Sequence, residues 1–490
     1  MTVMESKHIK VKSIKTNYVY NLIYEIFAVI APLITTPYIS RVLGPEGVGV
    51  YSFTYSIAQY FIIFGNLGIS IYGQMKIAEV RDDIHETSKT FYELLVLRCV
   101  TLLFSLLIYS FTVFAANEYK TARLILSVFI IASLFDFSWF FRGIENFSKV
   151  VLRDVLVKII VIILIFLLVK KPADVNIYIA LISASALIGN MTYIIALSRI
   201  IKPIQFGELK PGRHFKSCII YFIPTIATSV YTILDKTMLG ILTGGILENG
   251  YYEEAHKIEQ ILLVSITSYN AIMRSRMTYL YSKGDMHKMN EYMDKSIRFI
   301  LFLSIAMCGG LIGISETFIP LFLGSEFSES VVLLRLFSVL LVFIGLSNCI
   351  NTHFLGPSGR QNKNNIVLIT GALLNFILNM IFIPAIGAVG AALASVIAEL
   401  FILIGYLYLS RDFFKSVNII IFGWKYIVAS GIMTYVVHWI NRIDINPIAR
   451  LALQVGVGCC IYLVILLVLN DKVINEIIGK IRSISKEWLK

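Results

Sequence analysis

Long apolar stretches, separated by short polar segments, run through almost the whole chain of 490 residues. Each stretch has about the 20 residues that an α-helix needs to cross a bilayer, or more. Apolar residues follow one another continuously and do not alternate with polar ones, which favours helices over the strands of a membrane barrel. The pattern predicts an all-α polytopic membrane protein with fourteen spans, at residues 17–42, 48–72, 91–116, 121–142, 150–170, 175–198, 215–240, 255–281, 297–323, 330–355, 364–385, 387–409, 424–441 and 447–470.

Composition supports this interpretation. Hydrophobic residues make up 57% of the chain, charged residues only 15%, and the mean hydropathy is +0.78. A soluble globule has too little polar surface to cover so much apolar material. The first apolar run is too long for a signal-peptide core, so we expect it to remain as the first helix.

The positions of the basic residues indicate orientation. Most of the 43 lysines and arginines lie at the two ends of the chain and in alternate connections between spans. Cytoplasmic connections carry such an excess. We therefore predict an even number of spans and two cytoplasmic termini. The net charge of +12 then needs no nucleic-acid partner.

A spacing pattern indicates an internal duplication. Tyr, Ile and Gln recur with the same separations at Tyr51, Ile57 and Gln59 and at Tyr252, Ile258 and Gln260. Repeated halves are common in transporters, with the substrate site between them; chance is the alternative, because Tyr and Ile are frequent here. We predict a cytoplasmic N-terminal segment (1–16), an N-lobe of helices 1–6 (17–198), a cytoplasmic linker (199–214), a C-lobe of helices 7–12 (215–410), helices 13–14 (424–470) and a cytoplasmic tail (471–490).

No motif for catalysis or metal binding is present. The sequence has no G-x-x-x-x-G-K-[ST] loop and no H-E-x-x-H, and its six cysteines form no C-x-x-C pair. Such motifs position phosphates, metals and nucleophiles in enzymes. We therefore expect a protein that is not an enzyme and holds no metal.

Several ionisable residues fall within or at the ends of spans. A charge at the bilayer centre costs at least about 2.5–3.5 kcal/mol, so deep charges are expected to face protein or water. Snorkelling from helix ends is the alternative, especially for the arginines. These residues are Glu25, Arg98, Asp136, Arg142, Lys158, Asp235, Lys236, Arg274, Arg276, Arg335 and Glu399.

Prolines and aromatic residues mark two further features. Pro32, Pro37 and Pro224 lie in spans one and seven, where each removes a helix hydrogen bond and permits bending. Paired bending suggests a gate, although inert kinks explain the prolines equally well. The aromatic residues of segment 135–145 suggest an interfacial belt, which explains Trp139 but not Asp136.

Four motifs together resemble the Wzx-type polysaccharide flippases. The first is residues 34–44, Ile-Thr-Thr-Pro-Tyr-Ile-Ser-Arg-Val-Leu-Gly, and the second is Asp136-x-x-Trp-Phe-x-x-Gly-x-Glu145. The others are Asp235-Lys-x-Met-Leu-Gly240 and the Asn- and Gly-rich segment 375–392. The resemblance covers residues 17–410. It departs at Ser275, where many relatives have a proline before an arginine.

The resemblance implies membership of the multidrug/oligosaccharidyl-lipid/polysaccharide exporter superfamily. It implies two six-helix lobes around a central cavity and transport by alternating access. The implied cargo is an undecaprenyl-pyrophosphate-linked oligosaccharide repeat unit, moved across a bacterial cytoplasmic membrane for capsule, O-antigen or teichoic-acid-like polymers. No cofactor is expected, with proton or sodium coupling left open, and a polysaccharide polymerase and other assembly proteins are candidate partners.

We expect positive side chains to contact the anionic head group of this cargo. Guanidinium groups bind phosphate with paired, planar donors. The candidates, chosen by repeat position and charge, are Arg41, Lys236, Arg274 and Arg276. Glu25 and Asp235 are candidates for ion coupling, because inward-facing carboxylates in membranes bind protons or sodium.

The sequence leaves three alternatives open. A multidrug exporter on the same scaffold predicts a smaller and more apolar cavity with an acidic centre for cationic drugs. A lipid II or teichoic-acid flippase of the same superfamily is separated poorly by sequence. A membrane glycosyltransferase would need a large extramembrane segment, whereas the connections here are short.

Overall fold

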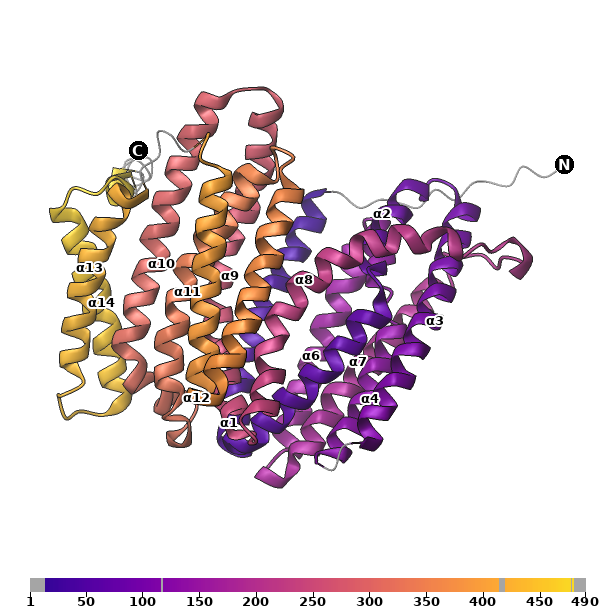
Figure 1. Ribbon diagram of the computed structural model, residues 1–490, viewed down its shortest axis with the longest axis horizontal. Helices are drawn as coiled ribbons and strands as arrows, with labels where there is room; N and C mark the ends of the chain where they lie inside the picture. Colours follow the sequence, from indigo (N-terminus) through magenta and orange to yellow (C-terminus); the bar gives the residue numbers. More distant parts are fainter. Residues whose placement is uncertain (1–13, 116–117, 414–418, 477, 480–490) are drawn as a thin grey trace, which may run out of the picture. The chain divides into compact units, whose positions relative to one another are not determined.

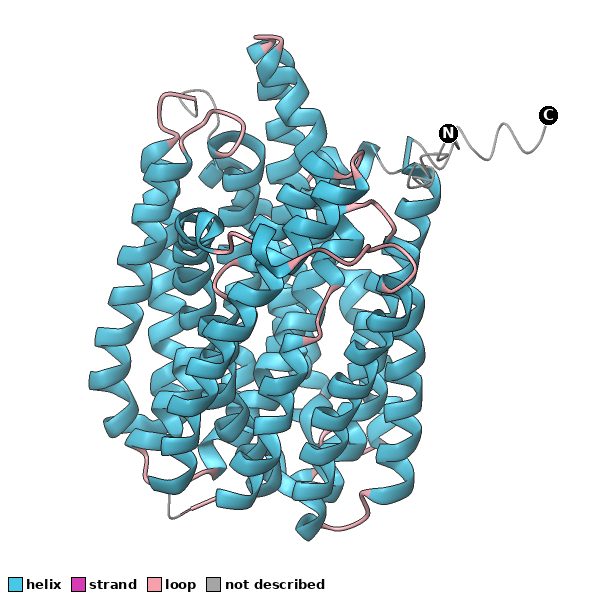
Figure 2. Ribbon diagram, turned by 90° about the vertical axis from the view of Figure 1, so that its right-hand side faces the viewer, coloured by secondary structure: helices cyan, strands magenta, loops and turns pink. Residues whose placement is uncertain are grey.

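The computed structural model describes residues 14–115, 118–413, 419–476 and 478–479. These residues form helices joined by short loops, and no strand occurs among them (Figure 2). The chain divides into two compact units, residues 1–240 and 241–490. This division falls within the helix predicted to begin the C-lobe at residue 215, and the lobe boundaries remain a prediction.

The first unit contains seven helices and nearly all of an eighth within its described part (Figure 1). Helix α1 packs against α3, α4 and α6, and α4 packs against α7. Two short helices, α2 and α5, pack on each other. The bounds are α1 (Ile14–Asn66), α2 (Ile69–Val80), α3 (Ile84–Ala115), α4 (Lys120–Leu134), α5 (Ser138–Gly143), α6 (Phe147–Leu168), α7 (Val175–Leu197) and α8 (Gly212–Leu242).

The second unit contains six long helices in its described part. Helices α10 and α11 pack together, and α13 and α14 lie side by side next to α10 (Figure 1). A π-helical turn at Asn351–Leu355 extends α11. The bounds are α9 (Leu247–Ser282), α10 (Met286–Phe322), α11 (Ser330–Ile350), α12 (Gln361–Leu409), α13 (Ile419–Ile440) and α14 (Pro447–Val468).

The predicted spans map onto these helices with two kinds of correction. Predicted spans one and two form the single helix α1, kinked at Gly44, where φ is 67° and Pro45 follows. Spans eleven and twelve likewise form α12, kinked at Ile386 and Gly387. The second correction is that span two ends earlier than predicted, at Asn66, and that span four is divided between α4 and α5.

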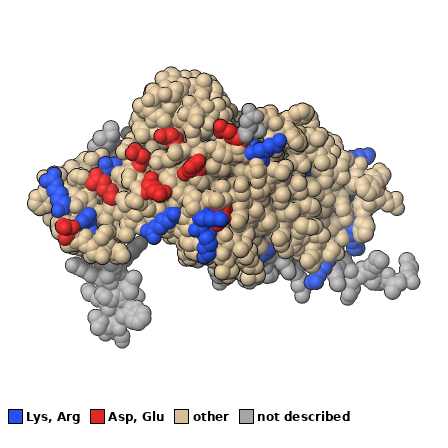
Figure 3. All heavy atoms as spheres, turned by 90° about the horizontal axis from the view of Figure 1, so that it is seen from below, with Lys and Arg blue, Asp and Glu red and all other residues tan. Residues whose placement is uncertain are grey.

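Surface composition confirms a multi-pass membrane protein. Eight helical segments among the described residues are long and apolar enough to cross a bilayer. On α3 the side chains of Phe104, Leu107 and Phe111 are 66%, 64% and 76% exposed. Apolar faces of this kind are covered by lipid. Seen along the helices, charged side chains of both signs are scattered over a surface formed mostly by other residues (Figure 3).

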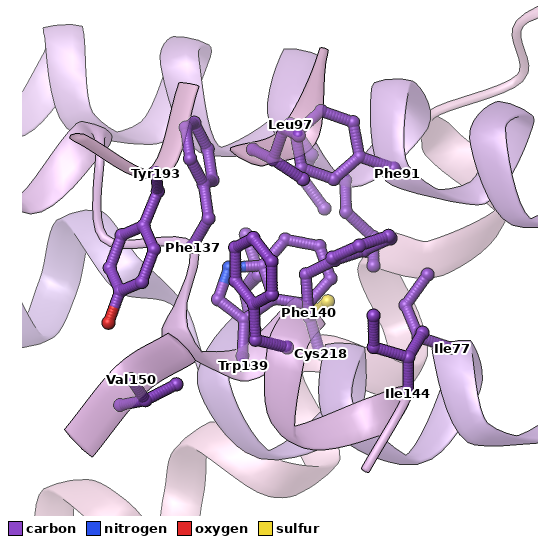
Figure 4. Packing of buried hydrophobic residues seen from close by; sticks show 14 residues of the cluster. Ile77, Phe91, Leu97, Phe137, Trp139, Phe140, Ile144, Val150, Tyr193 and Cys218 are labelled. Atoms are coloured by element: carbon purple, nitrogen blue, oxygen red, sulfur yellow. The ribbon is translucent and has the colours of Figure 1, made fainter. Parts of the chain in front are cut away.

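A cluster of aromatic side chains forms the core beneath α2 and α5. Trp139, Phe140 and Phe141 are at most 1% exposed, and the Phe91 ring stacks on Trp139 with ring centroids 5.8 Å apart (Figure 4). The interfacial-belt interpretation of segment 135–141 is therefore wrong for these three residues. Their rings lie inside the protein because α5 is a separate short helix that packs against α2 and α6, and not the last turn of a straight membrane span.

Close packing at this cluster predicts a sensitive position. A Cβ atom added at Gly73 would lie 2.6 Å from Trp139 Cε3. This distance is too short for two carbon atoms, so the indole ring or the helix backbone would have to shift. We expect Gly73→Ala to lower the free energy of unfolding by about 1–3 kcal/mol.

The control is Gly207→Ala, because no atom lies within 4 Å of the added Cβ at that exposed position. Thermal unfolding midpoints of both variants in detergent make the comparison. Equal midpoints for wild type, Gly73→Ala and Gly207→Ala would contradict the packing described here.

Candidate functional site

The first unit contains a cavity of about 510 Å³ lined by five helices and the α4–α5 connection. Its wall combines charged and neutral polar side chains with apolar ones. The charged members are Asp136, Arg142, Arg153, Asp154 and Lys158, and the neutral polar members are Thr35, Ser138, Tyr178, Ser185, Asn190 and Tyr193. We call this space the unit 1 cavity.

Helical periodicity explains how α6 and α7 line one space. On α6 the lining positions include Asp154, Lys158, Ile162 and Ile165, which recur every three or four residues and share a face. On α7 the lining positions from 178 to 193 follow the same spacing. Apolar residues of α1, including Pro32, complete the wall.

The break between α4 and α5 places Asp136 at the cavity. One carboxylate oxygen of Asp136 accepts a hydrogen bond from the Ser138 backbone N–H at 3.1 Å, which starts α5. The Asp136 carbonyl accepts a hydrogen bond from Arg98 Nη1 at 2.7 Å. Arg98 is 1% exposed and also donates to Asn66 Oδ1 at 2.6 Å. Snorkelling is therefore wrong for Arg98, whose charge binds oxygen atoms inside the unit.

Arg153 on α6 connects the two helices, α6 and α7, that form most of the cavity wall. Its guanidinium donates to the Gly189 carbonyl at 2.7 Å, to Asp154 at 2.5 Å and to Asn190 Oδ1 at 2.5 Å. It also lies over the Tyr193 ring, 4.4 Å from the centroid. Asn190 in turn donates to the Ala132 carbonyl at 2.8 Å. One side chain thus ties α6 to α7, and α7 is tied to α4.

The rigid aromatic core supports this wall. The Tyr193 ring stacks on Phe141, with ring centroids 5.2 Å apart. The Tyr193 hydroxyl lies at the edge of the cluster (Figure 4). That hydroxyl accepts a hydrogen bond from Arg153 at 3.1 Å. The lining of the unit 1 cavity is therefore fixed by packing and by hydrogen bonds on its outer side.

The predicted head-group residues lie apart from this cavity. Arg41 on α1 is exposed and Lys236 on α8 is half-buried, and neither is among the described lining residues. Arg274 and Arg276 belong to the second unit, where both are exposed on α9. Arg276 donates to the Tyr292 hydroxyl at 3.2 Å. Grouping of the four around one head group remains a prediction.

The other predicted site residues have varied surroundings. Asp235 is 4% exposed on α8. Glu25 lies in α1 and Pro224 in α8, and both side chains lie outside the described residues. Backbone angles at Pro32 and Pro37 remain helical, and the described kink of α1 lies at Gly44. The role of these prolines as a gate remains a prediction. At Ser275, where the sequence departs from many relatives, α9 is helical.

Other charges within predicted spans are paired or buried. Arg335 donates to Glu316 at 2.6 Å and to the Ser315 hydroxyl at 2.9 Å, close to the end of α10, where both charged side chains are partly exposed. Glu399 is 8% exposed on α12. Sequence reasoning singled out Asp136, Arg142 and Lys158, which meet at the unit 1 cavity, but missed Arg153, Asp154 and Asn190.

A signal for part of the missed set was present. Asp154 and Lys158 stand four residues apart, which places them on one face of a helix. Arg153 and Asp154 lie near the start of the predicted span 150–170, where charged residues at a helix end draw little attention. Asn190 carries no signal of its own within an apolar span.

Long apolar helices around a cavity with charged, polar and apolar side chains in its wall are typical of a multi-pass membrane protein of the transporter class. The family model described as "Polysaccharide biosynthesis protein" matches residues 14–273, so the chain belongs to this family. This match confirms the resemblance to Wzx-type polysaccharide flippases.

Individual relatives agree with this class. The chain is 22% identical over 397 residues to a "Putative O-antigen transporter" of Escherichia coli (strain K12), covering 79% of this chain and 94% of the relative. A protein of the same description from Shigella dysenteriae is 22% identical over 377 residues, covering 76% of this chain and 94% of the relative. These relatives are transporters by name, in agreement with the prediction that the protein is not an enzyme.

Solved structures share the fold. The structure "Lipid II flippase MurJ, inward closed conformation" gives a TM-score of 0.73 at 18% identity, covering 94% of this chain and 100% of that one. An inward-facing multidrug resistance MATE family transporter of the MOP superfamily gives 0.63 at 16% identity, covering 82% and 96%. At these identities the likeness concerns the fold alone.

Proposed function

We propose that this protein is a flippase that moves an undecaprenyl-pyrophosphate-linked oligosaccharide repeat unit from the inner to the outer leaflet by alternating access. The cargo serves capsule or a related cell-surface polysaccharide. The protein resides in the bacterial cytoplasmic membrane with both termini in the cytoplasm. Family membership and the names of the two transporter relatives support this proposal.

The single observation that carries the proposal is a cavity of about 510 Å³ between helices of the first unit, with five charged side chains in its wall. Sugar hydroxyls and phosphates lose their hydrogen bonds to water in hydrocarbon, at a cost of several kcal/mol for each unpaired group. A polar cavity replaces those hydrogen bonds while the prenyl tail stays in lipid. An exporter of cationic drugs would not require the basic side chains Arg142, Arg153 and Lys158 in its wall.

The cationic residues contact the pyrophosphate in this proposal. Arg41, Arg274 and Arg276 have exposed side chains that are accessible to a head group, and Lys236 is half-buried. Charge-assisted hydrogen bonds to phosphate contribute about 1.5–3 kcal/mol each. Bending at Pro32, Pro37 and Pro224 would permit the change between inward and outward access.

Removing these charges tests the head-group contact. We expect the combined variant Arg41→Gln, Lys236→Gln, Arg274→Gln and Arg276→Gln to reduce polymer export by at least about tenfold, because about 1.4 kcal/mol of lost binding has that effect. Surface polysaccharide, measured per cell at matched protein levels in membranes, gives the readout.

A matched variant removes the same number of charges elsewhere. It replaces four exposed lysines by glutamine, at Lys120, Lys171, Lys202 and Lys283. This control should export normally. Normal export by the first variant would remove the four residues from the site.

Glu25 and Asp235 couple transport to an ion in this proposal. Asp235 is buried within a membrane helix, and carboxylates in that position can bind protons or sodium. We expect transport in vesicles to respond to a proton or a sodium gradient, and Asp235→Asn to remove most of that response. An equal transport rate with and without a proton gradient, and with and without a sodium gradient, would exclude the coupling role.

Deleting the gene tests the substrate class. We expect an undecaprenyl-pyrophosphate-linked oligosaccharide to accumulate on the inner leaflet, identified by mass spectrometry of extracted lipids. Complementation with the wild-type chain should remove it. Accumulated lipid II or a teichoic-acid precursor would reassign the cargo, and drug hypersensitivity with unchanged lipids would favour the multidrug exporter.

A further inference from the structure

The chain between α7 and α8, residues 198–211, is bound to α3 through a buried carboxylate. We call these residues the α7–α8 connection. Glu93 of α3 is fully buried, and one of its carboxylate oxygens accepts a hydrogen bond from the Lys210 backbone N–H at 2.8 Å. The other oxygen accepts hydrogen bonds from Arg213 Nε and from His214 Nε2, both at 2.8 Å. The end of the connection and the start of α8 thus supply the donors that this buried acid requires.

His214 extends the attachment from α3 to α2. Its side chain is 2% exposed, and its second ring nitrogen, Nδ1, lies 2.8 Å from the Tyr72 hydroxyl. Because Nε2 of a neutral imidazole carries the proton donated to Glu93, Nδ1 is the acceptor and the Tyr72 hydroxyl donates. The start of α8 is therefore bound to both α2 and α3, beside which it runs (Figure 1).

Backbone packing continues this contact along α8. Gly68, which precedes α2, has a φ of 71°. A Cβ atom added there would lie 2.6 Å from the Cys218 carbonyl oxygen and 2.7 Å from the Phe222 backbone nitrogen. The backbone of α8 therefore lies directly on Gly68, where no side chain fits. The contact reaches from His214 to Phe222.

The connection is also attached nearer its beginning. The Lys202 backbone N–H donates to the hydroxyl of Ser88, a buried residue of α3, at 3.0 Å. His85 of α3 lies 3.4 Å from the Glu208 carboxylate, and both of these side chains are exposed. The connection therefore follows α3 over much of its length.

Separation of the connection from α3 would be costly. It would leave the Glu93 charge buried without its donors, and an unpaired buried charge is far less favourable than one that is hydrogen-bonded. A contact with this chemistry favours a single closed arrangement over one that opens and closes repeatedly.

We propose that Glu93 clamps the α7–α8 connection and the first turns of α8 onto α2 and α3, and that transport requires this clamp to stay closed. The part of α8 up to Phe222 then moves with the N-lobe, although the sequence pattern places residues from 215 onwards in the C-lobe. Movement between the lobes begins beyond Phe222. This inference rests on the proposed transport by alternating access.

The first test measures amide hydrogen exchange in the full-length protein in lipid nanodiscs. Glu93→Gln keeps the size of the side chain but places an amide NH₂ against the donors of Arg213 and His214. We expect exchange within residues 199–214 to become at least about tenfold faster, because the local opening equilibrium shifts. The matched control is Glu86→Gln, also on α3, whose side chain is 43% exposed and lies 4.0 Å from Lys89. Its exchange should equal that of wild type.

The second test links the connection to α3 covalently. The exposed pair His85→Cys and Glu208→Cys is joined by a short bismaleimide, and transport of lipid-linked oligosaccharide is measured in liposomes. With Glu93 intact, the linked protein should transport at the rate of the unlinked one. Glu93→Gln should transport at least about tenfold more slowly, and the link should restore its rate, because the link replaces the clamp. Single-cysteine variants treated in the same way control for modification of the six native cysteines.

Each outcome decides the inference. A link that stops transport with Glu93 intact would show that the clamp opens in every cycle and would overturn it. Unchanged exchange in Glu93→Gln, or slowed transport that the link does not restore, would also overturn it. The flippase function fails separately, if deletion accumulates no lipid-linked oligosaccharide, and the exchange measurement then still decides whether Glu93 holds the connection.

Discussion

Polar groups inside a hydrocarbon layer must find partners within the protein, and the first unit is built around this constraint. Arg98 is the clearest case. Its buried guanidinium binds the Asp136 carbonyl and the Asn66 side chain at 2.7 and 2.6 Å. The carbonyl is available because α4 stops at Leu134. A helix break that would otherwise leave backbone groups unpaired is thus matched by a buried cation.

That break has consequences for the cavity. It turns the chain into the short helix α5, whose aromatic side chains fill the core beneath α2. The same turn places the Asp136 side chain on the opposite side, at the cavity wall. Tyr193 belongs to both the core and the wall, and Arg153 joins it to α6. Packing on one side of α5 therefore holds the polar side chains of the cavity wall on the other side in place. Just beyond the end of α5, Glu145 forms an ion pair with Arg81 at 2.6 Å.

Sequence reasoning predicted much of the fold because hydrophobic length is a strong signal. The kinks at Gly44 and at Gly387 lie at the predicted boundaries between spans, where glycine and proline interrupt the apolar pattern. It could not predict that segment 135–141 turns inward, because Trp and Phe suit both a membrane interface and a buried core.

The candidate site could be predicted from the sequence only in part. Asp136 and Lys158 were recognisable as costly charges within spans, and the structure brings both to one cavity. Arg153 lies near the end of a predicted span, where an arginine can reach the interface, and only the structure shows its partner on α7. Asn190 is uncharged and carries no comparable cost. The head-group assignment of Arg41 and Arg274 rests on repeat position and charge, and it stays a prediction because the two residues belong to different units.

The most direct test of the central claim is reconstitution of the purified protein into liposomes that contain an undecaprenyl-pyrophosphate-linked oligosaccharide in both leaflets. A lectin added outside reports how much of the glycan becomes accessible with time. The account predicts that the inner-leaflet fraction becomes accessible only when the protein is present. Accessibility equal to that of protein-free liposomes, with the protein folded and inserted, would contradict it.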